Sequence, residues 1–312
     1  MIKREAYMSR IRPFIGGELI KVITGIRRSG KSVMLELIKD ELAAAGVGRE
    51  SVVSINFEDM RFARLLTAQA LHDEIASRVK QIEGKAYLFF DEIQEVADWE
   101  KCVNSFRVEF DCDIYITGSN AKLLSGELAT YLGGRYVEFV VYPFSFSEFT
   151  ELYRSAFPDT PPNVCFQKYL LFGGMPYLGN LRYEEEPCRQ YLKDLFNSVQ
   201  LKDIVKRNQV RDVDLLERIL AYVMANIGTT FSATSVSKFF KSEKRGVSTE
   251  TILNYITYCA DAYLFYRVRR QDLQGKQILT TNEKYYAADH GINYFDTAFT
   301  YHNQTSESVV GE

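Results

Sequence analysis

The sequence predicts an α/β fold with a parallel sheet, followed by a mostly helical region. Short apolar runs alternate with helix-forming stretches in the N-terminal part, which is the pattern of strands joined by crossover helices. Beyond about residue 150, helical patterns predominate. We therefore expect four parts, at residues 1–155, 156–210, 211–285 and 286–312, the last being a truncated remnant or a disordered tail.

Five segments are expected to form the strands, because each is short, apolar and rich in β-branched or aromatic residues. They are residues 19–24, 51–57, 85–92, 112–119 and 135–144. The third, KAYLFFDE, carries carboxylates only at its end, as in a parallel strand that is buried on both faces. Helices are expected between the strands, at residues 31–44, 67–84 and 102–110.

The composition excludes several classes of protein. A formal net charge of -3 provides no global positive field that would recruit nucleic acid. The five cysteines are dispersed without a C-x-x-C pair, and the three histidines show no metal-ligand spacing. No run is apolar and long enough to span a bilayer, and the N-terminus lacks the apolar core of a signal peptide. We therefore expect a cytoplasmic protein with reduced thiols and no membrane partner.

The stretch TGIRRSGKSVML, residues 24–35, contains the pattern G-x-x-x-x-G-K-[ST] between an expected strand and an expected helix. Glycines let backbone N–H groups surround phosphates, and the N-terminus of the following helix adds partial positive charge. Lys31 is expected to reach the β- and γ-phosphates of ATP, and Ser32 to bind Mg²⁺. A chance match is the alternative, but the flanking strand and helix are those that the mechanism requires. The candidate nucleotide-binding residues of this P-loop NTPase are Gly25, Arg28, Ser29, Gly30, Lys31, Ser32 and Val33.

Two carboxylates, Asp91 and Glu92, end the apolar strand at 85–92. Asp91 is expected to hold Mg²⁺ together with Ser32, and Glu92 to polarise the attacking water as a general base. A solvent-exposed acidic strand end is the alternative, which the phosphate loop makes less favourable. One strand fits between the two motifs, and this spacing with a glutamate after the aspartate is the arrangement of hydrolytic ATPases.

The strand at 112–119 ends in the polar run Thr117-Gly118-Ser119-Asn120. A polar residue there would lie between the two motif strands and could contact the γ-phosphate or the attacking water. We expect Ser119 and Asn120 to form this sensor pair. For any one of these residues, a simple turn-forming role is equally open.

The motifs together resemble the AAA-type prokaryotic ATPases that carry a C-terminal nuclease-like domain, DUF4143. The resemblance runs in motif order from residue 1 to about residue 292, through GIRRSGKS, INFED, YLFFDEIQEVADWE, YITGSNAKLLSGELATYLGGR and YPFSFSEF. It implies an ATPase core, a winged helix and then a domain similar to restriction endonucleases.

The resemblance also implies roles for individual residues. Residues 25–32 become the Walker A loop, Asp91 and Glu92 become Walker B, and Asn120 becomes sensor 1. Arg135, in LGGR, stands where an arginine finger is expected to act across a subunit interface, which implies a homo-oligomer. A surface arginine after a Gly-Gly turn is an equal alternative for Arg135. Arg28 is favoured to contact phosphates over being a solvated loop residue.

For two stretches of the C-terminal part, our interpretation differs from what the family resemblance implies. GGMP, residues 173–176, is similar to a family segment, but we interpret it as a turn that ends a helix. In the family, the stretch like KYYAADHGI leads into the nuclease-like domain, whereas this sequence ends soon after it, and the residues that follow the stretch contain no E-x-K or D-x-[DE]-x-K pattern. We therefore expect a truncated or frame-shifted chain without nuclease activity.

Residues 231–264 have the outline of a helix–turn–helix, and the strand-like stretches 265–272 and 276–289 complete the pattern of a winged helix. Basic residues around the turn and the wing suit contacts to DNA phosphates. They are Lys238, Lys241, Lys244, Arg245, Arg267, Arg269 and Arg270. The second helix argues against DNA binding, because it has no basic residue and because four of its residues are expected in the core. These are Ile252, Leu253, Ile256 and Leu264.

The sequence is best explained by a Mg²⁺-dependent ATPase that couples its nucleotide state to movement of the helical and winged-helix parts. One alternative is a nucleotide-gated DNA-binding regulator that hydrolyses ATP slowly. The other is a P-loop kinase that phosphorylates a small molecule.

Overall fold

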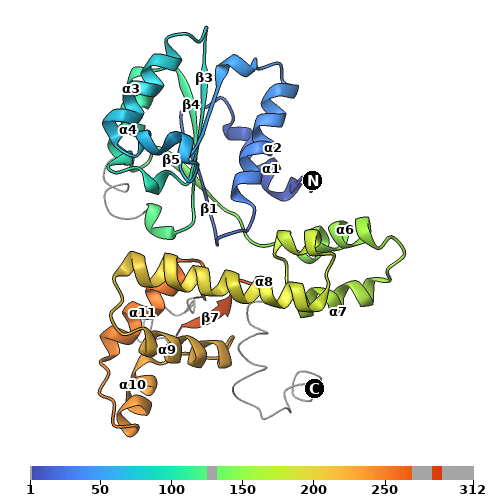
Figure 1. The fold of residues 1–312 in the computed structure, drawn as a ribbon, viewed down its shortest axis with the longest axis vertical. Helices are drawn as coiled ribbons and strands as arrows, with labels where there is room; N and C mark the ends of the chain where they lie inside the picture. The colour runs from blue at the N-terminus through green and yellow to red at the C-terminus, as the bar shows by residue number, and fades with distance from the viewer. Residues whose placement is uncertain (1, 125–131, 269–282, 290–312) are drawn as a thin grey trace, which may run out of the picture. The chain divides into compact units, whose positions relative to one another are not determined.

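A computed structural model describes residues 2–124, 132–268 and 283–289 of the chain. Two compact units make up the protein, Met1–Tyr142 and Pro143–Glu312 (Figure 1). Arg269, Arg270 and most of the expected tail at 286–312 lie outside the described residues.

Unit 1 contains a parallel sheet of five strands in the order β2-β3-β4-β1-β5. The strands are β1 (Ile20–Thr24), β2 (Val52–Asn56), β3 (Ala86–Asp91), β4 (Cys112–Gly118) and β5 (Tyr136–Val140). All five predicted strands are therefore confirmed, although the fifth ends at Val140 rather than at residue 144. Thr24 pairs with Gly118, and Asn56 pairs with Asp91, so the carboxyl ends of these strands meet at one edge of the sheet.

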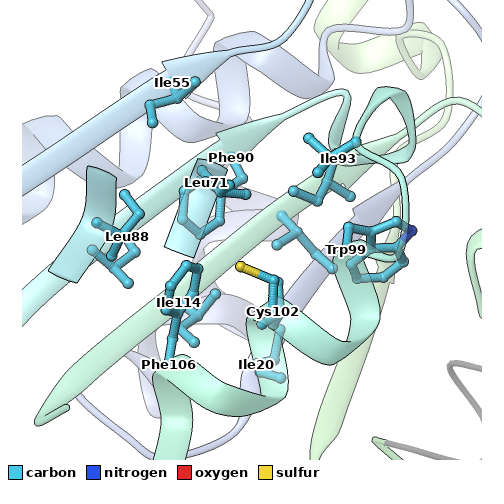
Figure 2. Close-up of a cluster of buried hydrophobic side chains, with 14 of the residues drawn as sticks. Ile20, Ile55, Leu71, Leu88, Phe90, Ile93, Trp99, Cys102, Phe106 and Ile114 are labelled. Carbon is cyan, nitrogen blue, oxygen red and sulfur yellow. The ribbon is translucent and has the colours of Figure 1, made fainter. Parts of the chain in front are cut away.

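Helices cover both faces of this sheet. Figure 1 shows α1 (Glu5–Ile11) and α2 (Lys31–Ala44) on one side, and α3 (Ala68–Val79) and α4 (Trp99–Glu109) on the other. The alternation along β1 divides its side chains accordingly, with Val22 in the core under α3 and α4 and Ile23 in the core under α1 and α2. In Figure 2, strand residues Leu88, Phe90 and Ile114 lie with Phe106 and Cys102 of α4.

Two predicted helices differ at their ends from the structure. α3 ends at Val79, five residues before the expected Gly84, and a tight turn follows in which the Gln81 N–H donates to the Arg78 carbonyl. α4 begins at Trp99 rather than at residue 102, because Trp99 belongs to the buried helical face that Cys102, Val103 and Phe106 continue. The helix predicted at 31–44 is confirmed at both ends.

Unit 2 is mostly helical in the described residues. It contains α6 (Phe146–Ala156), α7 (Pro162–Phe172), α8 (Glu185–Ser198), a π-helical segment (Val199–Lys206), α9 (Val213–Ala225), α10 (Ala233–Ser242) and α11 (Thr249–Asp261). Strands β6 (Phe265–Val268) and β7 (Lys284–Ala287) pair antiparallel. Gly173 ends α7 with a φ of 74°, which confirms that GGMP forms a helix-ending turn.

Two further features of the described chain bear on the sequence predictions. The five cysteines are unpaired, as expected from their spacing, and each of them is buried. None of the helices in the described residues is long and apolar enough to cross a membrane.

Candidate nucleotide site

The loop from Gly25 to Gly30 joins β1 to α2 and has a backbone that only glycine suits at its two ends. Gly25 has a φ of 139°, and Gly30, which caps α2, has a φ of 99°. A Cβ atom at Gly25 would lie 2.2 Å from the carbonyl oxygen of Val141, just after β5. The two glycines of the motif are thus explained by the geometry of the loop itself.

Lys31 begins α2 and is almost completely buried. Its ammonium group donates to the carbonyls of Gly25 and Ile26, each at 3.1 Å from Nζ. The positive charge is therefore held inside the curve of the loop, at the N-terminus of a 14-residue helix. Such a site suits the phosphate groups of a nucleotide.

The other predicted loop residues differ in exposure. Ser29 is fully buried, whereas Arg28, Ser32 and Val33 are exposed. Arg28 adopts the left-handed backbone region with a φ of 68°. It is Arg27 that ion-pairs with Glu58, at 3.4 Å between Nη1 and Oε1, and that acts electrostatically on Glu92.

Asp91, the last residue of β3, is buried and accepts hydrogen bonds from two neighbouring strands, through the hydroxyl of Thr117 and the amide of Asn56 at 3.1 Å. The hydroxyl of Ser32, in the first turn of α2, lies close enough to act on the charge of the same carboxylate. The structure thus brings together Ser32 and Asp91, the two predicted metal ligands. Burial raises the pKa of Asp91, although the hydroxyl groups of Thr117 and Ser32 oppose the shift.

Glu92 follows Asp91 with a left-handed φ of 56°, and its N–H donates to the Thr117 hydroxyl at 2.9 Å. Its carboxylate accepts from Gln94 and from the Ser119 hydroxyl, which lies 2.8 Å from Oε1. Burial alone would raise the pKa of Glu92, but the charge of Lys31 and these donors together lower it below its ordinary value. At neutral pH the side chain is therefore an ionised carboxylate that can accept a proton from water.

Ser119 and Asn120, the predicted sensor pair, are both buried and follow β4 at the same edge of the sheet. Ser119 contacts Glu92, as described above, so its hydroxyl is part of the site. Asn120 precedes a 3₁₀ turn in which the Leu123 N–H donates to the Asn120 carbonyl at 3.1 Å.

Arg135 is not brought to the phosphate loop within unit 1. Its carbonyl accepts from the N–H of Ile20, the first residue of β1, whereas the loop follows the last residue of that strand. Arg135 therefore lies at the amino edge of the sheet, exposed, and donates from Nη1 to Asn104 at 3.2 Å. An arginine finger at this position would have to serve a neighbouring subunit, which stays a prediction.

Three residues of the site were not predicted from the sequence. Asn56 ends the inserted strand, so the rule that singled out Asp91 could have found it. No sequence pattern could have indicated Gln94 or Arg4. The partner of Gln94 is determined by the shape of a turn, and the partner of Arg4 by a contact between distant segments. Arg4 is buried and donates to the carbonyl of Ser29 at 3.0 Å.

The basic residues of unit 2 divide into two groups. Lys238, Lys241 and Lys244 are exposed around α10 and the turn after it. Arg245 instead forms ion pairs with Asp212 and Asp214. Arg267 pairs with Glu283, at 3.7 Å between Nε and Oε1.

The second helix of the pair, α11, has a buried face and an exposed one. Ile252, Ile256 and Leu264 are buried as predicted. The prediction that Leu253 lies in the core is wrong, because its side chain is 46% exposed on the outer face of the helix.

A parallel sheet in this strand order, with a phosphate loop after β1 and paired carboxylates after β3, defines an AAA-like P-loop fold. Residues 17–150 match the family model of an AAA domain, and residues 165–299 match a domain of unknown function, DUF8612. The C-terminal match is thus to a domain other than the DUF4143 domain of the resemblance.

Two curated relatives extend over nearly the whole chain. An uncharacterized protein of Haemophilus influenzae is 38% identical over 293 residues, which are 94% of this chain and 72% of that protein. An uncharacterized protein of Methanocaldococcus jannaschii is 30% identical over 292 residues, which are 90% of this chain and 63% of that protein. The chain belongs to the same family as the Haemophilus influenzae protein, and its residues 17–150 form an AAA-type P-loop domain.

Solved structures with a similar chain course include three proteins at 13% sequence identity. The ORC1 protein of Aeropyrum pernix, solved in complex with DNA, has a TM-score of 0.40 and matches over 96% of this chain and 92% of its own. AMPPCP-bound DnaA of Aquifex aeolicus has a TM-score of 0.42, with 83% and 88% covered. Cdc6p of Pyrobaculum aerophilum has a TM-score of 0.40, with 90% and 89% covered.

Proposed function

We propose that this chain binds ATP with Mg²⁺ in the phosphate loop of unit 1 and hydrolyses its terminal phosphoanhydride bond. The observation that carries the proposal is the convergence of Lys31, Asp91 and Glu92, three buried charged residues, at the carboxyl edge of one sheet. Burying charges is unfavourable unless they act on a ligand or on one another. A phosphate-binding ammonium beside two carboxylates suits phosphoryl transfer to water.

The residues around Asp91 suit Mg²⁺ by their chemistry. Mg²⁺ prefers oxygen ligands, and here the Asp91 carboxylate and the hydroxyl of Ser32 lie close together. When bound, Mg²⁺ would neutralise charge on the phosphates. Lys31 would contribute a second positive charge, and Glu92 would orient the attacking water and accept its proton.

Phosphate release from ATP in the absence of any acceptor molecule tests this proposal. Lys31→Ala is expected to abolish ATP binding, since it removes the charge inside the loop. Glu92→Gln is expected to retain binding and to lower hydrolysis by about 10²- to 10⁴-fold, the usual contribution of a general base. Normal hydrolysis by Glu92→Gln would refute the assignment of the base, and phosphate transfer only to an added small molecule would favour a kinase.

For unit 2 we propose a small helical region at 156–210 and a winged helix at 211–285. Helices α10 and α11 followed by the antiparallel pair β6 and β7 support this proposal, because their order is that of a winged helix. We further propose that ATP binding and hydrolysis shift these parts, and that Arg135 acts on the nucleotide of a second subunit. Measuring the oligomeric state with and without ATP tests the role of Arg135. We expect ATP to change the oligomeric state of the unmodified protein and not that of Arg135→Ala.

A further inference from the structure

Gln94 lies in the tight turn that follows β3. The turn is closed by bonds from the Glu95 N–H to the Glu92 carbonyl at 3.1 Å and from the Val96 N–H to the Ile93 carbonyl at 3.0 Å. Ile93 is fully buried in the core and anchors the turn. As a result the Gln94 side chain returns to Glu92, and its amide nitrogen donates to Oε2 of that carboxylate.

Ser119, which directly follows the neighbouring strand β4, holds the same carboxylate. Its hydroxyl lies 2.8 Å from Oε1 and 3.1 Å from Oε2 of Glu92, and Ser119 is itself buried. Two elements of the fold therefore fix the orientation of one side chain. An ionised carboxylate has about four acceptor positions, so these two donors leave capacity for a water molecule.

The orientation of the Gln94 amide is forced by this contact. Only the NH₂ group can face a carboxylate, so the amide oxygen must point away from Glu92. That oxygen is buried and has no hydrogen-bond partner within the described part of the chain. A buried carbonyl without a donor is unfavourable for stability, which argues that the arrangement serves something other than folding.

Gly118, the last residue of β4, provides the space for this amide. A Cβ atom there would lie 2.9 Å from the Gln94 amide oxygen and 2.7 Å from a methyl group of Leu123. Gly118 does not have a left-handed φ, so its backbone conformation does not require glycine. Its lack of a side chain is instead explained by the room that Gln94 and Leu123 occupy.

We propose that Gln94 is a positioning residue that, together with Ser119, holds the Glu92 carboxylate so that a free acceptor position meets the attacking water. This inference rests on the proposed hydrolysis of ATP. Gln94 acts through Glu92, and no described hydrogen bond joins it to the phosphate loop. Its removal should therefore affect the chemical step and leave nucleotide binding intact.

Gln94→Met tests the proposal, because it keeps the length of the side chain and removes the donor. We expect kcat to fall about tenfold, the rate equivalent of one weakened hydrogen bond to a charged group, while KM changes less than about twofold. Gln69→Met is the matched control, since the Gln69 amide donates to Asp73 at 2.9 Å on the exposed surface of α3. This control should hydrolyse ATP like the unmodified protein. Gly118→Ala should reproduce the loss of kcat, because a methyl group there displaces the Gln94 amide.

A merely structural role for Gln94 would give a different pattern. The affinity for a non-hydrolysable ATP analogue would then fall along with kcat. An unchanged kcat in folded Gln94→Met, with a hydrolysing unmodified protein, would overturn the inference and leave the proposed function intact.

Crystal structures with Mg²⁺ and the analogue give a second readout that needs no hydrolysis. We expect Glu92 to contact both Gln94 and Ser119 in the unmodified protein and to leave Ser119 in Gln94→Met. A Glu92 carboxylate that keeps its position in Gln94→Met would overturn the inference. Absence of phosphate release from the unmodified protein, with Glu92 held as expected, would refute the proposed function alone.

Discussion

Arg4 holds the phosphate loop by its backbone, through a hydrogen bond of 3.0 Å from Nη1 to the carbonyl oxygen of Ser29. The same guanidinium donates from Nη2 to the carbonyl of Tyr142, at 2.8 Å. It also lies 4.6 Å from the centre of the Tyr7 ring, whose hydroxyl accepts from the N–H of Tyr142 at 3.0 Å. The N-terminal segment thus ties the loop to the chain that follows β5.

Replacing Arg4 with Met should destabilise unit 1 and weaken nucleotide binding. We expect the free energy of unfolding to fall by about 2–4 kcal/mol, because the buried carbonyl of Ser29 and the partly buried carbonyl of Tyr142 lose a charged donor. Trp99, the single tryptophan of the chain, is buried in unit 1, so its fluorescence during urea unfolding reports on this unit. Arg10→Met, at an exposed position of α1, is the control and should change stability by less than about 0.5 kcal/mol. Equal stability of the two variants would show that the Arg4 contacts contribute little.

Lys21 and Asp113 form an ion pair in which neither side chain is exposed to solvent. Asp113 also accepts from the Gly16 N–H and the Tyr115 hydroxyl, each at 2.7 Å. Lys21→Met should lower the free energy of unfolding by about 3–5 kcal/mol, because it leaves a buried carboxylate without its counter-charge. Combining Lys21→Met with Asp113→Leu should lower the free energy of unfolding by less than the sum of the two single effects. Strict additivity in the same fluorescence assay would contradict a coupled pair.

These two clusters show where sequence reasoning ends. Asp91 and Glu92 could be predicted, because polar groups at the carboxyl end of a buried strand interrupt an apolar pattern. Lys21 interrupts the apolar run of β1 in the same manner, but its partner Asp113 is 92 residues away and no pattern connects them. Gly25 could be predicted from the motif, whereas the Val141 carbonyl that requires it is set by the pairing of β1 with β5.

Asp91 and Glu92 should affect stability in opposite directions, which follows from the signs of their pKa shifts. Burial raises the pKa of Asp91, so the folded state binds this proton more tightly than the unfolded chain does. Stability should therefore fall as pH rises from the ordinary aspartate pKa through the raised one. Asp91→Asn is expected to raise the melting temperature at pH 7 in EDTA, with a gain that shrinks in acid.

Glu92→Gln provides the opposite case in the same assay. Burial opposes ionisation of Glu92, but Lys31, Gln94, Ser119 and Arg27 outweigh it and lower the pKa in the folded state. The stability that this ionised carboxylate contributes is present above the ordinary glutamate pKa and is lost as pH falls through the lowered one. The variant should therefore melt at a lower temperature than the unmodified protein at pH 7, with a smaller difference in acid. Shifts of the same sign for both variants would contradict these assignments.

DNA binding by unit 2, if it occurs, should depend on the exposed lysines and not on Arg245. Lys238, Lys241 and Lys244 are exposed near the turn between α10 and α11, whereas Arg245 ion-pairs with Asp212 and Asp214. Because each neutralised phosphate releases counterions, replacing the three lysines with Ala should reduce the salt dependence of log K by about one for each phosphate that a lysine had neutralised. Arg245→Met should leave that slope unchanged, since its charge is already paired.

Fluorescence anisotropy with a labelled duplex from low to moderate salt measures both slopes. No binding at low salt, or an equal slope for the triple variant and the unmodified protein, would favour a winged helix that packs against protein, in keeping with the absence of basic residues from α11.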